Sequence, residues 1–267
     1  MRILAIGDIF GRPGRTAFRD LLPRIIAEHR VDAVVANAEN AAGGRGLTAN
    51  VAKEILESPV HVLTAGNHTL EDKTILSLLE SHPILRPLNL VGTIPGRGWY
   101  AWTLKGLCRV AVVSMQGQVF MEGKGGDVQS PFTAIDAVLP IIQKEADVIL
   151  IDFHAEATSE KRCFAWYVDG RVAAVVGTHT HVQTADEEIL PGGTAYISDL
   201  GMTGPHASVV GLDKDIAIHR FLTGDKKKFE VASSGVRVEG VLIDMDERTG
   251  KARSIQRIKA SWSGEVN

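Results

Sequence analysis

Polar side chains that commonly bind metals recur along this 267-residue sequence. Two carboxylates, two amides and three imidazoles stand out: Asp8, Glu39, Asn40, Asn67, His154, His179 and His181. His179 and His181 are two residues apart, so they would share one face of a strand or point into one cavity from a turn, a spacing that suits metal ligation. This donor set suits Mn, Fe or Zn, and it is too rich in nitrogen for a dedicated Mg or Ca site.

The number of donors exceeds the four of a tetrahedral zinc site, which favours two ions that share a bridging carboxylate. Two ions about 3.5 to 4 Å apart hold a hydroxide between them and stabilise the oxygens of an in-line displacement at phosphorus. The predicted chemistry is therefore hydrolysis of a phosphate ester.

Taken singly, most of these residues have an ordinary structural explanation. Asp8 could cap a helix or occupy a turn, as Asn40 and Asn67 could, and His154 could be a hydrogen-bonded core histidine. Glu39 is harder to explain, because a carboxylate beside an apolar strand end requires a partner or a cation. One shared site explains all of them more simply than several coincidences.

The elements that would position these residues are short apolar runs that directly precede them. Strands are predicted over residues 3–6, 33–36, 60–65, 148–153 and 172–176. The carboxyl ends of parallel strands lie along one edge of a sheet, so the donors should converge on one cleft. Helical patterns lie between the strands, over residues 14–30, 48–57, 70–82, 131–145 and 159–168. This alternation predicts an α/β layer fold.

Two stretches break that alternation. Residues 99–104 and 109–115 read as a hairpin joined around Lys105-Gly106, and residues 228–261 read as three further strands, which together suggest a second, mixed or antiparallel sheet. Residues 117–130 and 192–208 are expected to form long loops. The sequence has no internal repeat and no linker, so we expect a single domain over residues 1–267.

Composition excludes several classes of protein. With 45% hydrophobic and 23% charged residues, the chain is of ordinary globular composition rather than disordered. A net charge of −3 provides no basic field for long nucleic acids. No apolar run is long enough for a membrane span or a secretory signal, and Cys108 and Cys163 form no disulfide framework, so we expect a cytoplasmic protein that does not bind membranes.

The order of these residues resembles the calcineurin-like metallophosphoesterases, and several segments resemble their YmdB-like branch. The segments are Gly-Asp-Ile-Phe-Gly at 7–11, Ala-Glu-Asn-Ala at 38–41, residues 152–156, Ser-Glu-Lys at 159–161, and residues 177–184 and 198–204. The resemblance covers nearly the whole chain. It implies a four-layer αββα sandwich of two mixed sheets flanked by helices.

The resemblance also implies a role for each site residue. One metal would be held by Asp8, Glu39, Asn40 and His181, and Glu39 would bridge to a second metal completed by Asn67, His154 and His179. His68 would act on the scissile ester from outside the metal shells, which suits an imidazolium that protonates the departing alkoxide. Phe10 departs from the superfamily pattern, since it stands where an Asp-x-His motif usually supplies a histidine. Asn40 could fill that vacancy.

The branch implies a phosphodiesterase that hydrolyses 2′,3′-cyclic nucleotides with a metal-bridging hydroxide, and iron or manganese as its two divalent ions. Arg12 and Arg45 could contact the substrate phosphate, although either could equally be a solvated surface arginine. Two alternatives remain open: a phosphatase acting on monoesters or phosphoproteins, and a regulatory protein that binds metal and nucleotide with little turnover. The partner expected is a small phosphodiester; Trp99, Trp102 and Trp166 could be core residues or contacts in a homo-oligomer.

Overall fold

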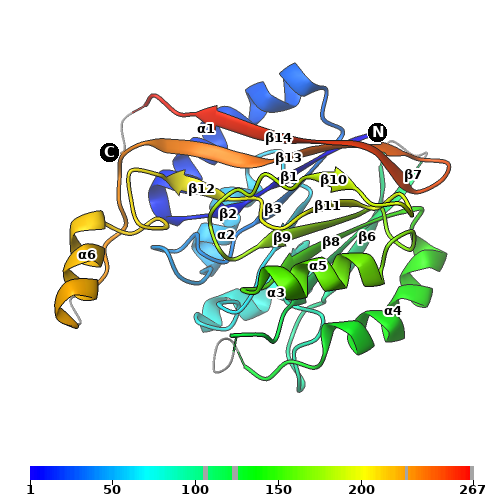
Figure 1. Cartoon of the computed structure of the whole chain (residues 1–267), viewed down its shortest axis with the longest axis horizontal. Helices are drawn as coiled ribbons and strands as arrows, with labels where there is room; N and C mark the ends of the chain where they lie inside the picture. The colour runs from blue at the N-terminus through cyan, green and yellow to red at the C-terminus, as the bar shows by residue number, and fades with distance from the viewer. Residues whose placement is uncertain (105–107, 122–125, 226–227, 265–267) are drawn as a thin grey trace.

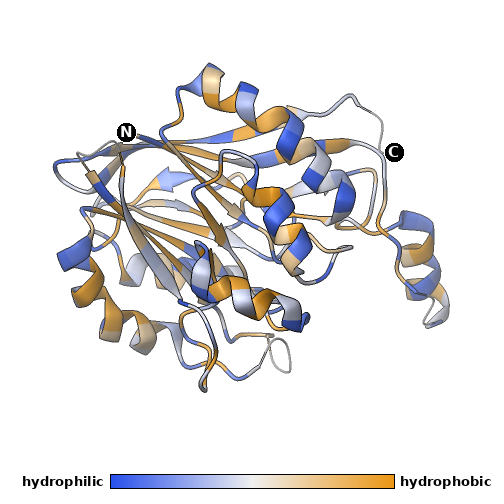
Figure 2. Cartoon of the chain, turned by 180° about the vertical axis from the view of Figure 1, so that it is seen from behind, coloured by the Kyte–Doolittle hydropathy of each residue, from blue (hydrophilic) through white to orange (hydrophobic). Residues whose placement is uncertain are grey.

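The computed structural model describes residues 1–104, 108–121, 126–225 and 228–264. Two mixed β-sheets pack face to face, and helices cover their outer faces (Figure 1). Figure 2 shows that apolar residues are concentrated in the strands and alternate with hydrophilic residues along the helices. The predicted four-layer αββα sandwich is confirmed.

The first sheet contains most of the N-terminal strands and the C-terminal hairpin. Its strands are β1 (Arg2–Ile6), β2 (Asp8–Ile9), β3 (Ala33–Asn37), β4 (Val62–Thr64), β5 (Ile84–Leu85), β12 (Met202–Pro205), β13 (Val236–Asp246) and β14 (Lys251–Ser261). Their order is β2-β12-β13-β1-β3-β4-β5, with β14 paired to β13. Strands β1, β3, β4 and β5 run parallel, whereas β13 is antiparallel to β1.

The second sheet is built from the middle of the chain. Its strands are β6 (Trp99–Leu104), β7 (Cys108–Gln116), β8 (Val148–His154), β9 (Ala174–Thr178), β10 (Glu188–Ile189) and β11 (Ala195–Ile197), in the order β10-β11-β9-β8-β7-β6. Its four inner strands are parallel and both edges are antiparallel.

Alternation along the strands builds three apolar layers. In β1, Leu4 and Ile6 pack against the helical layer, whereas Ile3 and Ala5 face the second sheet. This is the period of two expected of a pleated strand, and both faces are apolar because both are covered. The helices α1 (Gly11–His29), α2 (Ala49–Leu56) and α3 (Leu76–Ser81) cover the first sheet, and α4 (Pro131–Glu145) and α5 (Thr158–Tyr167) cover the second.

Several predicted elements differ from the observed ones. The five predicted parallel strands do not form one sheet, because β1, β3 and β4 lie in the first and β8 and β9 in the second. The predicted loop 192–208 contains β11 and β12, and the predicted helix 70–82 is a short 3₁₀ turn, η1 (Lys73–Ile75), followed by α3. The Asp72 side chain accepts a hydrogen bond from the Thr74 amide and caps this turn, so helical structure begins at Lys73 rather than at residue 70.

The C-terminal region also differs. It contains two strands, β13 and β14, rather than three, and a further helix, α6 (Lys214–Thr223), which the sequence did not predict. The predicted hairpin of β6 and β7 is confirmed, with its turn at Lys105-Gly106 outside the described residues. In the loop predicted over 117–130, residues 117–121 and 126–130 contain neither helix nor strand, and the remaining residues lie outside the described part.

Candidate metal centre

The predicted donors meet where strands of both sheets end. Asp8 follows β1, and Glu39 and Asn40 follow β3; Asn67 follows β4; these strands belong to the first sheet. His154 ends β8 and His179 follows β9 in the second sheet. The convergence predicted for one sheet edge is therefore achieved by two sheets whose strand ends face one cleft.

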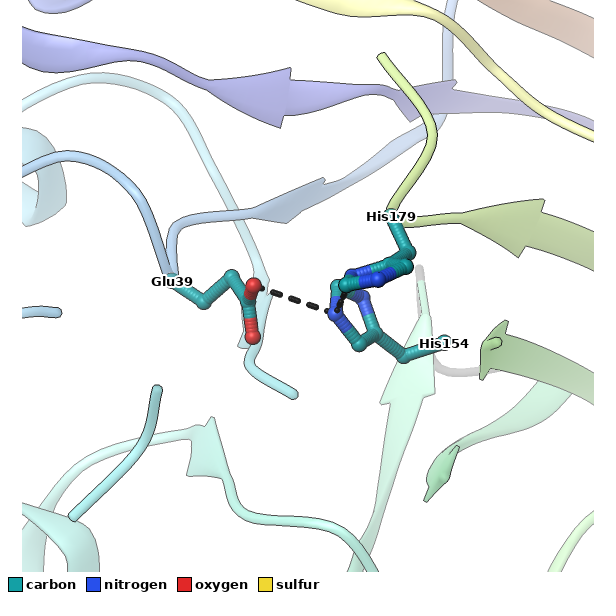
Figure 3. Close-up of side chains that lie close together, drawn as sticks. All are labelled: Glu39, His154 and His179. Atoms are coloured by element: carbon teal, nitrogen blue, oxygen red, sulfur yellow. Dashed lines mark hydrogen bonds and ion pairs between the residues drawn. The ribbon is translucent and has the colours of Figure 1, made fainter. Parts of the chain in front are cut away.

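Three donors surround one ring nitrogen of His154. Glu39 Oε1, Asn67 Oδ1 and His179 Nδ1 each lie 3.0 Å from His154 Nε2. Figure 3 shows Glu39, His154 and His179 pointing toward one another from three separate segments of the chain. We call Asn67, His154 and His179 the inner set.

The hydrogen bond made by the other ring nitrogen of His154, Nδ1, determines which tautomer the neutral ring adopts. Thr178 Oγ1 lies 2.9 Å from His154 Nδ1 and donates its own proton to Asp152 Oδ1 at 2.7 Å. The Thr178 hydroxyl therefore accepts the proton on Nδ1, so a neutral His154 presents the lone pair of Nε2 to the cluster. Asn37 donates to Asp152 at 3.0 Å, and this carboxylate is buried in the core.

The ionisation of the cluster follows from its burial. Glu39 and His154 are both fully buried. Burial opposes the charge on Glu39, but the neighbouring His154 lowers the Glu39 pKa to about 2. Burial likewise opposes the charge on His154, but Glu39 raises the His154 pKa to about 9. The two pKa shifts have one cause, the attraction between the Glu39 carboxylate and the His154 ring.

The remaining donors, Asp8, Asn40 and His181, form what we call the outer set. Asn40 Nδ2 lies 3.0 Å from His181 Nε2 and 3.4 Å from Asp8 Oδ1. The same amide nitrogen lies 3.3 Å from Glu39 Oε1, the oxygen that also contacts His154. Glu39 thus touches both sets, as a bridging ligand must.

The inner and outer sets are joined through the backbone as well. The His179 amide donates to Asp8 Oδ2 at 3.2 Å. Burial raises the pKa of Asp8 to about 6, while His181 and His154 lower it. A divalent cation would favour the ionised carboxylate here for the same reason that the two imidazoles do.

The turn that carries His179 and His181 has an unusual backbone. Their φ angles are 100° and 64°, in the left-handed region that side chains other than glycine rarely adopt. Asp199 supports the turn, since its Oδ2 accepts from the Thr180 amide at 3.0 Å and hydroxyl at 2.8 Å. Lys161 Nζ lies 2.9 Å from the same oxygen in a buried ion pair. Residues 159–161 and 198–204 were notable in the sequence, but their contact was not predicted.

Glycine is required beside the inner set. A Cβ at Gly66 would lie 2.1 Å from His154 Cδ2 and 2.3 Å from Glu39 Oε2. No side chain fits there unless the donors separate, so Gly66 allows the β4 turn to approach the cluster. The Gly66-Asn67-His68 turn then directs Asn67 into the inner set.

His68 lies at the edge of the cluster. Its amide donates to Glu39 Oε2 at 3.3 Å, and its Nδ1 lies 3.3 Å from Glu71 Oε1. Glu71 also pairs with Arg45 at 2.6 Å, and the pKa of the Glu71 carboxyl is lowered, first by the hydrogen bond from Arg45 and then by the one with His68. Sequence reasoning missed Glu71, because residues 67–70 form a turn, where the i, i+3 pairing rule of helices does not apply.

A cavity of about 550 Å³ opens in front of both sets. It is lined by Phe10, Glu39, Asn40, Gly43, Gly44, Arg45, His68, His179, His181, Val210, Leu212, Lys228 and Phe229. The structure thus brings Arg45 to the site. It does not bring Arg12 there: Arg12 lines a separate cavity beside Arg15, Glu54 and Trp262, because it sits on the exposed side of α1.

Phe10 occupies the place of the absent histidine. Its ring meets that of His181 edge to face, with centroids 5.3 Å apart at 77°. The ring is buried and packs against Gly44 and Gly211. Phe10 therefore packs against the candidate ligand His181 but cannot itself bind a metal.

The donor set fits divalent metal ions. Lone pairs of Glu39, Asn67, His154 and His179 converge, and such an arrangement requires a proton or a cation between the atoms. Asn40 can present either its oxygen or its nitrogen by rotating its amide. The fold and this site together define a phosphoric ester hydrolase of the metallophosphoesterase type, a fold that implies divalent metal ions.

Comparison with known proteins supports the assignment to this class of hydrolase. Residues 4–258 match the model of the family described as "YmdB-like protein". A curated 2′,3′-cyclic-nucleotide 2′-phosphodiesterase of Bacillus subtilis is 42% identical over 97% of this chain and 96% of its own length. The chain belongs to the YmdB-like family.

Solved structures show the same fold. A hypothetical protein of Thermus thermophilus has 38% identity and a TM-score of 0.90, over 98% of this chain and 99% of that one. A phosphatase of Mycoplasma pneumoniae has 31% identity and a TM-score of 0.91, over 98% and 93% of the two chains. None of the described helices is long and apolar enough to cross a membrane.

Proposed function

We propose that this protein is a phosphodiesterase that opens 2′,3′-cyclic nucleotides with two divalent transition-metal ions, iron or manganese. The observation that carries the proposal is the position of Glu39 Oε1, within 3.3 Å of donors from both the inner and the outer set. The high identity to the Bacillus subtilis phosphodiesterase supports the substrate class.

Each set would hold one ion. Asp8, Asn40 and His181 would bind the first and Asn67, His154 and His179 the second, with Glu39 shared. Imidazole-rich sites suit iron, manganese and zinc rather than calcium. Divalent ions held there would activate a water molecule for attack on phosphorus and neutralise charge on the phosphoryl oxygens.

The chain's own residues would supply the rest of the reaction. His68 lines the cavity, and its Nε2 lies 3.3 Å from Asn67 Nδ2, which can only donate to it. As an imidazolium turned toward the substrate, His68 would donate the Nε2 proton to the ribose oxygen that leaves phosphorus. Glu71 accepts from His68 Nδ1, which directs Nε2 away from the carboxylate. Arg45, held by Glu71, can bind a phosphoryl oxygen.

The test combines metal analysis with a substrate panel. Protein purified without chelator should contain two transition-metal ions per chain and should hydrolyse cyclic diesters faster than monoesters. His68→Ala should lower kcat on cyclic nucleotides by about 10²- to 10⁴-fold. Because nitrophenolate leaves without a proton, the same variant should act almost normally on a nitrophenyl diester.

Two other outcomes would decide against this proposal. Faster hydrolysis of monoesters by a wide margin would identify a phosphatase. Stoichiometric binding of metal and nucleotide with negligible turnover would identify a regulatory protein, the alternative that the substitution of a ligand by Phe10 keeps open.

A further inference from the structure

One wall of the cavity is apolar and has no part in the phosphate chemistry described above. Val210, Leu212 and Phe229 line the cavity together with the polar side chains of His68 and His179. Val210 is 44% exposed and Phe229 is 42% exposed. Large apolar side chains exposed beside a polar site commonly mark a ligand-binding surface.

The Phe229 ring is positioned so that it could stack on a flat ligand. The guanidinium carbon of Arg220 lies 3.8 Å from the centroid of the Phe229 ring, so a cation covers one face of the ring. Arg220 belongs to α6, which projects from one end of the molecule in Figure 1. With one face covered and the side chain still 42% exposed, the ring retains surface for a partner within the cavity that it lines.

Val210 links this wall to the candidate metal ligands. Its φ angle is 48°, which is exceptional for a β-branched residue. In that conformation its carbonyl oxygen lies 3.0 Å from His181 Nδ1, while its side chain lines the cavity. Backbone strain of this kind persists at sites where the surrounding structure imposes it. The Val210 part of this wall is therefore held in a fixed relation to His181 of the outer set.

We propose that this wall binds the base of the nucleotide, with Phe229 as the stacking surface and Val210 and Leu212 beside it. The inference rests on the proposed function, since it assumes a nucleotide substrate. The cavity volume of about 550 Å³ lies within the range of small-molecule sites. Arg45 and Lys228 line the same cavity, so cations for the phosphate and an apolar wall for the base occur together.

The experiment compares two substrates that differ only in the base. Adenosine 2′,3′-cyclic phosphate carries one, and 1-O-methylribose 2′,3′-cyclic phosphate does not. Phe229→Ala should lower kcat/KM for the adenosine ester by about 5- to 150-fold, the usual loss of one base–aromatic stack, through KM. The base-free ester should be hydrolysed as before, and Phe229→Trp should restore the adenosine ester.

Phe221→Ala is the matched control. Phe221 lies on α6 and is 89% exposed, but it does not line the cavity in the described part of the chain. Its replacement should leave both substrates unaffected. Equal losses for the two esters in Phe229→Ala, or no loss for the adenosine ester, would overturn the inference.

A failure of the proposed function itself would look different. The unmodified enzyme would then hydrolyse neither cyclic ester. Calorimetric titration with adenosine monophosphate and ribose monophosphate would still test the wall: Phe229→Ala should weaken only adenosine monophosphate. Equal affinity of the unmodified protein for both ligands would exclude a base-binding wall.

Discussion

The inner and outer donor sets differ in how firmly the fold positions them. In the inner set, Asn67 Oδ1 and His179 Nδ1 each lie 3.0 Å from His154 Nε2, as does the shared Glu39 Oε1, and His154 is fully buried at the end of β8. In the outer set, His181 and Asp8 are 3.8 Å apart, and the His181 side chain is 10% exposed. Asn40 and His181 of the outer set line the cavity, as does His179 of the inner set, whereas Asn67 and His154 are buried in the core.

The supports of the two sets differ in the same way. His154 is fixed through Thr178 and the buried Asp152, both on central strands of the second sheet. His181 is fixed through the carbonyl of Val210, in a segment outside both sheets. We therefore expect the inner set to bind its ion before the outer set does, because less reorganisation is needed there.

The largest effect should come from Glu39, the residue common to both sets. Glu39→Gln removes a shared negative charge, so both ions should be lost and activity should fall by more than the ~100-fold typical of an outer-shell partner. Metal content and kcat/KM measure the two effects. Glu54→Gln is the control, because Glu54 pairs with Arg15 away from the site. Retention of two ions in Glu39→Gln would contradict a bridging role.

Histidine substitutions should separate the two sets. His154→Ala should abolish the tighter ion and weaken the second, whereas His181→Ala should leave one ion bound with near-normal affinity. Isothermal titration of metal-free protein with Mn²⁺ would give the number of sites and their dissociation constants. If both variants lost the same ion, the division into two sets would be wrong.

A smaller effect is expected at Thr178. Thr178→Val keeps the shape but removes the hydroxyl that holds the proton on His154 Nδ1, so metal affinity should fall by about 10- to 100-fold. Thr178→Ser keeps the hydroxyl and should bind metal normally. Unchanged affinity in the valine variant would show that the ring needs no such support.

The smallest predicted effect is a gain in affinity for the outer ion. Phe10→His places an imidazole against His181, where the superfamily usually has a ligand, and should tighten the outer ion by up to about tenfold, or about 1.4 kcal/mol. The second dissociation constant in the Mn²⁺ titration reports it, with Phe10→Leu as the apolar control. A weakened outer site in the histidine variant alone would show that Asn40 already completes the coordination.

Much of the site could be predicted because its residues follow strands. A polar residue at the end of an apolar run is visible in sequence, and Glu39, Asn67 and His154 all have this position. The division of the strands between two sheets was not visible, since β1 and β8 are both apolar on both faces. The buried ion pair of Lys161 and Asp199 escaped prediction for another reason: it joins residues that are distant in sequence.

The sequence alone also could not distinguish the two candidate arginines. Arg12 and Arg45 both follow a glycine near a donor, so sequence treats them alike. The start of α1 turns Arg12 outward, whereas Glu71 holds Arg45 at the cavity. Helix α6 went unpredicted because only Ala217 is buried along it, so it has no apolar face directed at a core.

The contact between Glu39 and His154 links metal binding to the stability of the protein. Glu39 follows a strand of one sheet and His154 ends a strand of the other, so an ion bound to both would cross-link the two layers of the sandwich. At a free concentration about 100 times the dissociation constant, such an ion would add about 2.7 kcal/mol to the free energy of unfolding. Metal supply in the cell would then govern how long the chain survives proteolysis, as well as how fast it works.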